Sequence, residues 1–292
     1  MPEGMSSITG MAQPVMAGTG KFLKMMGVTV YYTKISGGYL TYTKHCLDER
    51  VGRVEVTVDR MFTPQELKRL PPQEIEDTMN RLLAHDDYIW NREAQVTFRG
   101  KGQMAKKLDT LLYMCPKCGA MYQMKCSGNE MRCTACGNTV SLDERYNLRP
   151  VGEGSVCPEL VSDWVLLERK KAEEDVKDPN FTYSGHVRVG KLPEHKTLKG
   201  DNTSVICGEG ELRLDHSGLT FAGTVEGKPC CFPILYVRRG RVYGVLSGPA
   251  GCAPLGPSDR GDAPRLRRQM AERALPALRL IALKRHNKKA RR

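Results

Sequence analysis

The chain has 292 residues, 40% of them hydrophobic, and a net charge of +12. This length predicts two or three modules, because a domain usually has roughly 100–200 residues. No apolar run approaches the ~20 residues of a membrane-spanning helix, and the N-terminus lacks the pattern of a secretion signal. These features argue against an integral membrane protein and a secreted protein, so we expect a cytoplasmic one.

The positive charge is concentrated near the C-terminus. Residues 265–292 contain eleven Arg or Lys and one acid, Glu272, and therefore carry +10 of the +12. The evenly basic surface that is typical of nucleic-acid binding is not indicated. We expect residues 248–292 to form a disordered basic tail. Its partner is either an anionic membrane surface, at the inner face of the membrane, or nucleic acid as the weaker alternative.

The first sixty residues predict part of an α/β unit, with a short helix over 20–26 and strands over 27–35 and 53–58. Residues 61–95 predict a helical connector. Within it, Thr63-Pro64-Gln65-Glu66 has the pattern of a capping box, and residues 72–84 place apolar residues at helical spacing. Asp86 and Asp87 are interpreted as a solvated turn or a helix cap, because no partner base is evident for paired carboxylates.

Residues 96–150 contain two near-identical CxxC pairs, each followed by Gly. The spacing lets both sulfurs of a pair bind one metal ion, and four thiolates favour tetrahedral Zn²⁺ at about 2.3 Å. The four predicted ligands are Cys115, Cys118, Cys133 and Cys136. A redox CxxC, the alternative, needs no second pair at this distance. We therefore expect a four-cysteine zinc ribbon whose Zn²⁺ is structural, with strands near 122–124 and 131–132.

The other seven cysteines show no such pattern. The total of eleven is odd, whereas a secreted disulfide framework is normally even, so reduced thiols are expected. Cys126 lies between the two CxxC pairs and is interpreted as a thiol outside the metal site.

Residues 151–180 predict a helix over 159–177, with Leu160, Trp164, Val165 and Leu167 on its apolar side. Residues 181–247 predict a small β-rich module, with strands over 205–207, 211–214, 219–221 and 242–246. A turn is expected at 215–218, and residues 208–210 are interpreted as a turn at the start of a strand. The predicted fold class is therefore α+β, built from several modules.

Pro2-Glu3-Gly4, followed by Ser6-Ser7, resembles the P-E-G motif of the 1-acylglycerol-3-phosphate acyltransferases. Residues 20–31 are similar to the helix and strand that follow this motif in the family, although Thr29 stands where Pro is commoner. The chain to about residue 246 resembles a bacterial architecture: a lysophospholipid acyltransferase domain, a four-cysteine zinc ribbon and a β-rich module. Further matching stretches are 37–41, 60–64, 86–90, 112–118 and 208–212.

This resemblance implies that residues 1–60 are the C-terminal part of an acyltransferase-like α/β domain. It also implies that Glu3 and Gly4 are the remnant of a site for glycerol phosphate. The implied partners are an acyl donor and a lysophospholipid, and the implied pathway is glycerophospholipid biosynthesis.

The family's chemistry needs His-x4-Asp, in which His is the general base and Asp orients it. None of the six histidines has Asp five positions later. No catalytic residue is therefore expected, and the chain is expected to be inactive alone. The alternative is a non-enzymatic zinc-ribbon protein that binds nucleic acid or a protein partner.

Overall fold

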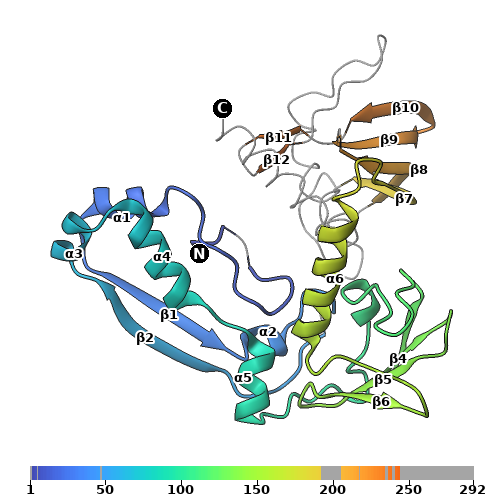
Figure 1. The fold of residues 1–292 in the computed structure, drawn as a ribbon, viewed down its shortest axis with the longest axis horizontal. Helices are drawn as coiled ribbons and strands as arrows, with labels where there is room; N and C mark the ends of the chain where they lie inside the picture. Colours follow the sequence, from blue (N-terminus) through green and yellow to red (C-terminus); the bar gives the residue numbers. More distant parts are fainter. Residues whose placement is uncertain are drawn as a thin grey trace. The chain divides into compact units, whose positions relative to one another are not determined.

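The computed structural model of the chain describes residues 2–4, 6–46, 48–191, 205–216, 218–233, 236–238 and 241–243. The chain divides into two compact units, Met1–Glu168 and Arg169–Arg292. The described residues combine helices with small antiparallel sheets, as the predicted α+β class requires (Figure 1). None of the helices among them is long and apolar enough to cross a membrane.

The first unit contains two sheets with helices around them. Its helices are α1 (Thr19–Met26), α2 (Gly38–Thr41), α3 (Pro64–Arg69), α4 (Pro72–Leu83), α5 (Asp87–Ala94), the short 3₁₀ helix η1 (Leu108–Thr110) and the first turns of α6 (Val161–Asp175). Its strands are β1 (Val30–Ser36), β2 (Glu55–Phe62), β3 (Met124–Ser127), β4 (Glu130–Cys133), β5 (Thr139–Leu142) and β6 (Leu148–Val151).

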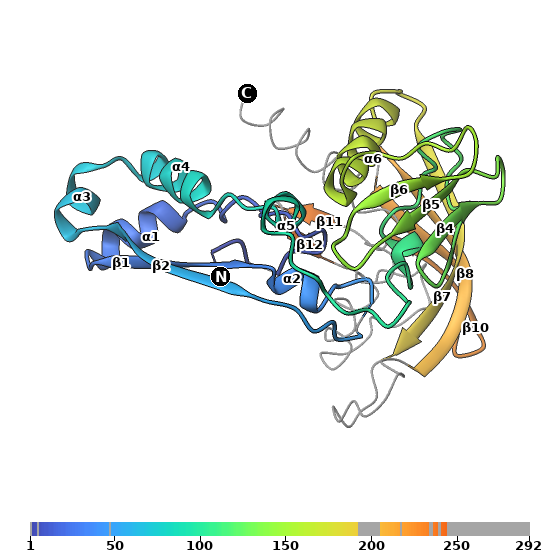
Figure 2. The ribbon, with the colours of Figure 1, turned by 90° about the horizontal axis from the view of Figure 1, so that it is seen from below.

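Strands β1 and β2 form an antiparallel hairpin, paired from Val30 with Phe62 to Ser36 with Glu55. Helices α1, α3 and α4 lie on one side of this hairpin (Figures 1 and 2). Phe62, Leu67 and Ile75 are buried between these elements. The hairpin and the three helices therefore share one hydrophobic core.

The other face of the β1–β2 hairpin is apolar and exposed. The side chains of Tyr31, Ile35, Val56 and Val58 are 65%, 52%, 60% and 63% exposed. They share a face because Ile35 pairs with Val56, and Tyr31 lies four residues before Ile35 on the same strand. A two-stranded hairpin is marginal by itself, and a contiguous exposed apolar face is typical of an interaction surface.

The predicted helix starts in the connector are confirmed. Thr63 caps α3, because the amide of Glu66 donates to Thr63 Oγ1 at 3.3 Å and the amide of Thr63 donates to Glu66 Oε2 at 2.7 Å. Helix α4 begins at Pro72, as its apolar spacing predicts. Asp86 caps α5 through the amide of Tyr88 at 2.8 Å, which confirms the helix-cap interpretation for this residue.

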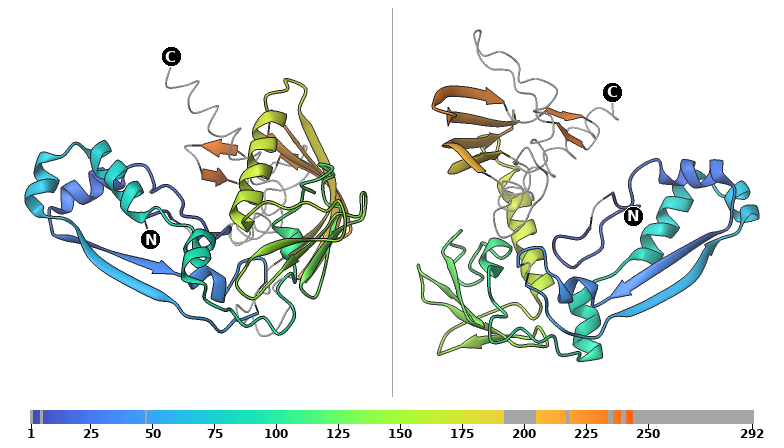
Figure 3. Two further views of the ribbon diagram at one scale, coloured as in Figure 1. Left: turned by 60° about the horizontal axis from the view of Figure 1, so that its bottom comes forward. Right: turned by 180° about the vertical axis from the view of Figure 1, so that it is seen from behind.

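Strands β3, β4, β5 and β6 form a four-stranded antiparallel sheet in that order. Figure 3 shows this sheet beside the first turns of α6. Trp164 and Val161 of α6 are fully buried in the core of this region. The predicted helix is confirmed, but Leu167 is 39% exposed, so its assignment to the apolar side was wrong. The neighbouring Glu168 is buried instead.

The second unit contains a sheet in the order β10-β9-β8-β7. Its strands are β7 (Thr182–Lys191), β8 (Val205–Asp215), β9 (Gly218–Val225) and β10 (Lys228–Pro233), and a separate pair consists of β11 (Tyr236–Arg238) and β12 (Arg241–Tyr243). Leu212, Leu214, Leu219 and Phe221 form the core of the sheet with Val176.

The predicted strands at 205–207, 211–214 and 219–221 are confirmed as parts of β8 and β9. Asp215 pairs with Gly218, so the two ends of the predicted turn at 215–218 lie opposite each other, as that turn requires. The predicted turn at 208–210 was wrong, because these residues continue β8. Of the last predicted strand, only residues 242 and 243 are described, and the predicted tail at 248–292 lies outside the described residues.

Candidate metal centre

The four predicted cysteine ligands come together in the first unit. The sulfur atoms of Cys115, Cys118, Cys133 and Cys136 all lie within 4.8 Å of one another. The Sγ atoms of Cys115 and Cys136 are 3.7 Å apart, and those of Cys118 and Cys133 are 3.9 Å apart. A tetrahedron with metal–sulfur bonds of about 2.3 Å has edges of about 3.8 Å. The cluster therefore has the donor set and the spacing to bind one metal ion.

The two halves of the cluster have the same backbone structure. In the first, the amide of Gly119 donates to the carbonyl oxygen of Cys115 at 2.9 Å; in the second, the amide of Gly137 donates to that of Cys133 at 2.9 Å. Gly119 has φ 71° and Gly137 has φ 75°, which a residue without Cβ adopts at little cost. The repeated C-x-x-C-G sequence thus folds into two equivalent turns.

One cysteine of each pair is buried and the other reaches the surface. Cys115 and Cys133 are fully buried, whereas Cys118 and Cys136 are not. Without a metal ion, burial raises the pKa of the Cys115 thiol to about 12, so this thiolate depends on a bound cation. Metal binding should accordingly release protons from the cluster.

Helix α6 supports the first turn of the cluster through the backbone N–H and C=O of Met114. The indole N–H of Trp164 donates to the carbonyl oxygen of Met114 at 2.8 Å. The amide of Met114 donates to Glu168 Oε1 at 2.8 Å. Burial raises the pKa of the Glu168 carboxyl well above its usual range. The indole N–H of Trp164 and the carboxyl of Glu168 are thus both bonded to the residue before Cys115.

Cys126 lies outside the cluster, as expected. Its sulfur accepts a hydrogen bond from the amide of Asp109 at 3.2 Å. Burial raises the pKa of this thiol to about 12. The residue therefore behaves as a structural thiol beside η1.

The two predicted substrate-binding residues lie in the N-terminal segment, apart from the metal cluster in sequence. The carbonyl oxygen of Pro2 accepts from the amide of Met16 at 2.8 Å. Gly4 has φ +75°, and a Cβ added there would lie 2.5 Å from Met16 Sδ. Among the described residues, Glu3 forms no hydrogen bond or ion pair. The residue is half-buried.

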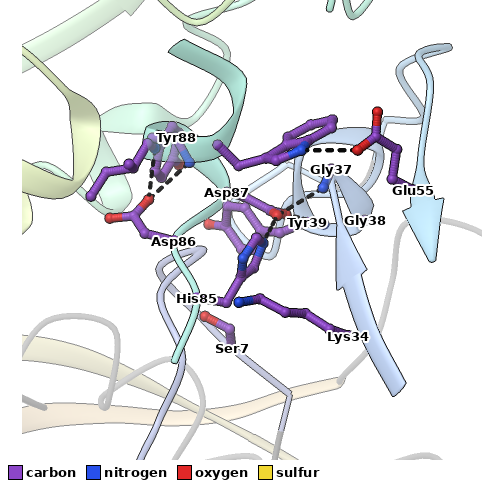
Figure 4. Close-up of polar contacts among 12 residues, drawn as sticks. Ser7, Lys34, Gly37, Gly38, Tyr39, Glu55, His85, Asp86, Asp87 and Tyr88 are labelled. Atoms are coloured by element: carbon purple, nitrogen blue, oxygen red, sulfur yellow. Dashed lines mark hydrogen bonds and ion pairs between the residues drawn. The ribbon is translucent and has the colours of Figure 1, made fainter. Parts of the chain in front are cut away.

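A second polar site, which the sequence analysis missed, lies between α4 and α5 (Figure 4). Asp87 is buried and not solvated, so the solvated-turn interpretation was wrong for this residue. Its Oδ1 lies 2.5 Å from Nε2 of His85, the partner base that the sequence did not reveal. Its carboxylate also accepts from the amides of Gly37 and Tyr39, at 2.8 Å each. The available signal was the His-x-Asp spacing directly after a predicted helix.

No protein-family model, no curated protein and no solved structure matches this chain. The function must therefore be argued from the residues and their geometry.

Proposed function

We propose that the metal of the four-cysteine cluster is Zn²⁺ and that its role is structural. Four thiolates leave no open position for a substrate, and the sulfur separations of 3.7 and 3.9 Å suit tetrahedral zinc. Two of the ligands, Cys115 and Cys133, belong to the same core as Trp164 and Tyr146, so the metal would hold this core together. Metal analysis of protein purified without chelator should give one zinc per chain, and metal-free folded protein would refute the proposal.

We propose that the chain is the C-terminal part of an acyltransferase of glycerophospholipid biosynthesis, which transfers an acyl group to a lysophospholipid. The observation that carries this proposal is the exposed apolar face of the β1–β2 hairpin, where Tyr31 and Val58 are 65% and 63% exposed. Such a face suits a sheet whose exposed side is covered by the rest of an α/β domain.

Two further observations support the proposal. The Pro2-Glu3-Gly4 segment is followed by helix α1 and strand β1, the order that the resemblance predicts. The segment is also held in place, because the carbonyl oxygen of Pro2 accepts from the amide of Met16 and Gly4 packs closely on the side chain of Met16. A fixed position suits residues that hold the glycerol phosphate of an acceptor.

The roles in this proposal are limited to binding and support. Glu3 and Gly4 would contact the acceptor, and the zinc ribbon would stabilise the first unit. The chain lacks the His-x4-Asp pair that deprotonates the acceptor hydroxyl in the family, so the pure chain should transfer no acyl group. Because the acceptor is a membrane lipid, we also propose that the protein contacts the membrane surface.

The test has two steps. The pure chain should give no transfer from acyl-CoA to 1-acylglycerol 3-phosphate. A fusion that places a His-x4-Asp half-domain of a 1-acylglycerol-3-phosphate acyltransferase before Pro2 should restore transfer, and Glu3→Ala in this fusion should reduce it. A fusion that binds zinc at one ion per chain but transfers nothing would refute the proposal, as would transfer by the pure chain.

A second candidate is a non-enzymatic protein whose zinc ribbon binds nucleic acid. Lys125 on β3 pairs directly with Arg132 on β4, and both side chains are exposed. Two like charges opposite each other are unfavourable unless an anion binds there. Salt-sensitive RNA binding that is lost in the Lys125→Gln, Arg132→Gln double variant would favour this candidate.

A further inference from the structure

The His85–Asp87 pair is held rigidly by groups from three parts of the first unit. Asp87 accepts from the amides of Gly37 and Tyr39, which join it to the end of β1 and the start of α2. The amide of Asp87 donates to the carbonyl oxygen of Gly10 at 3.1 Å, and the amide of Ala12 donates to that of His85 at 2.7 Å. The imidazole ring therefore has a fixed place between the N-terminal segment, β1 and α5.

The hydrogen bond to Asp87 leaves the other ring nitrogen of His85 available. Nε2 lies 2.5 Å from Asp87 Oδ1, so the hydrogen on Nε2 points toward the carboxylate. Among the described residues, Nδ1 of His85 has no hydrogen-bond partner. The side chain is 17% exposed, so solvent or a ligand reaches the ring.

Lys34 supplies a positive charge beside this ring. Its Nζ donates to the carbonyl oxygen of Ala84 at 2.8 Å, next to His85 in the chain. The ammonium group has three hydrogens, so two remain for other acceptors. Within the described part of the chain, no carboxylate pairs with Lys34. Figure 4 shows the end of its side chain beside His85 and Ser7.

The carboxylate of Asp87, the negative group at this site, already has hydrogen-bond donors. Asp87 is 3% exposed and has three donors of its own, the two amides and His85. The hydrogen bonds of Asp87 to backbone amides explain why its carboxylate is buried. They explain neither the Lys34 ammonium, which has no carboxylate partner among the described residues, nor the available Nδ1 of His85. The Lys34 ammonium is complementary to an anion, and Nδ1 of His85 donates to an anion when the ring carries both hydrogens.

Ser7 brings the segment after Pro2-Glu3-Gly4 to the same place. Its hydroxyl donates to the carbonyl oxygen of Met11 at 2.7 Å, and Met11 forms a β-bridge with Asp86. Because this donation uses the hydroxyl hydrogen, Ser7 is not set up as a nucleophile for His85. A binding site fits the geometry better than a Ser-His-Asp hydrolase.

We propose that Lys34 and His85 bind a phosphomonoester or inorganic phosphate, with Asp87 as the positioning residue for the imidazole. Lys34 supplies two N–H donors and a full charge, and protonated His85 donates from Nδ1. Glycerol 3-phosphate is the organic ligand to test, a choice that rests on the acyltransferase proposal. The anion site itself stands on the geometry of Lys34, His85 and Asp87.

The test is a titration of the zinc-loaded chain with inorganic phosphate, glycerol 3-phosphate or glycerol, followed by calorimetry and by the ring ¹⁵N signals of histidine. We expect both phosphates to bind, glycerol not to bind, and the Nδ1 signal of His85 to shift. Tighter binding of glycerol 3-phosphate would identify an organic phosphate as the ligand, and equal binding would identify free phosphate.

Lys34→Gln should weaken phosphate binding roughly tenfold or more, because a charge-assisted hydrogen bond is lost. Lys24→Gln is the matched control, since Lys24 also donates from Nζ to backbone carbonyls, those of Lys68 and Leu70. It should bind phosphate as the natural chain does.

Equal weakening in both lysine variants, or no shift of the His85 ring in the natural chain, would overturn the proposal. The ring signal needs no variant, so the test holds even if Lys34→Gln misfolds. Phosphate binding without acyl transfer by the fusion described above would keep the anion site and refute only the acyltransferase proposal.

Discussion

The indole N–H of Trp164 donates to the carbonyl oxygen of Met114 at 2.8 Å, one residue before the first cysteine of the metal cluster. The amide of the same Met114 donates to Glu168, one turn further along α6. The backbone of Met114 is therefore hydrogen-bonded to α6 through both its N–H and its C=O. Any change at Cys115 should reach this helix directly.

Removal of the metal should change the fluorescence of Trp164. Its side chain is fully buried beside the cluster, and loss of the ion would leave four thiols without a common partner. We expect the emission to shift to longer wavelength when a chelator removes the metal. The chain has two tryptophans, so Trp90→Phe isolates the signal of Trp164. Unchanged emission in that variant, after metal analysis confirms the loss, would contradict the coupling.

Replacing a ligand should cost far more than replacing the cysteine between the pairs. Cys133→Ser removes a buried ligand, so we expect the variant to lose the metal. Its free energy of unfolding should fall by an amount on the order of several kcal/mol. Cys126→Ser is the matched control, because its sulfur lies outside the cluster and accepts from the Asp109 amide. It should keep one metal per chain and lose about 1 kcal/mol or less. The measurements are the metal content and the thermal unfolding of both variants. Metal loss in both would show that the ligand set is wrong.

Glu168 should make the protein less stable as the pH rises. Burial raises the pKa of its carboxyl above the ordinary 4.5, so the folded state holds a proton that the unfolded state releases. Stability from this group is complete below pH 4.5 and declines as the pH rises toward the folded-state pKa. Glu168→Gln removes this proton exchange and keeps an acceptor for the Met114 amide.

The measurement is the free energy of unfolding of zinc-loaded natural chain and Glu168→Gln between pH 5.5 and 8. As the pH rises, the free energy of unfolding of Glu168→Gln should increase relative to that of the natural chain. The titration of all other groups affects both proteins equally and cancels in the difference. A difference that stays constant across this range would mean that Glu168 is ionised in the folded protein.

The features that the sequence predicted well depend on short stretches of chain. The two C-x-x-C-G repeats form the same turn, and the capping box of Thr63 and Glu66 needs only four residues. Helix α4 follows from its own apolar spacing. Such local patterns determine the local structure without distant contacts.

The features that it missed depend on residues far apart in the chain. Asp87 was interpreted as part of a solvated turn or a helix cap, yet its burial follows from the amides of Gly37 and Tyr39, about fifty positions earlier. Leu167 fits the apolar spacing of α6, but Glu168 is turned inward because the amide of Met114 needs an acceptor. Sequence periodicity does not contain these tertiary partners.

The glycines of β8 provide the last prediction. Gly210 pairs with Gly223 on β9, and a Cβ on Gly210 would lie 2.4 Å from the carbonyl oxygen of Ala222 and 2.6 Å from Gly223 Cα. The ring of Phe221 lies over both glycines, 2.9 and 2.8 Å from the two Cβ positions. Paired glycines on two neighbouring strands thus allow close backbone approach under an aromatic ring, although residues 208–210 look like a turn in sequence.

Gly210→Ala should therefore destabilise the sheet of the second unit by about 1–3 kcal/mol, because backbone atoms have to move. Gly185→Ala is the matched control in the neighbouring strand β7, where an added Cβ meets only Tyr183 Oη at 3.6 Å. This control should be neutral or slightly stabilising, since alanine restricts the unfolded chain. Hydrogen exchange of the β8 and β9 amides measures both effects within the second unit. Faster exchange in Gly185→Ala than in Gly210→Ala would mean that the Gly210–Gly223 contact does not limit the packing of this sheet.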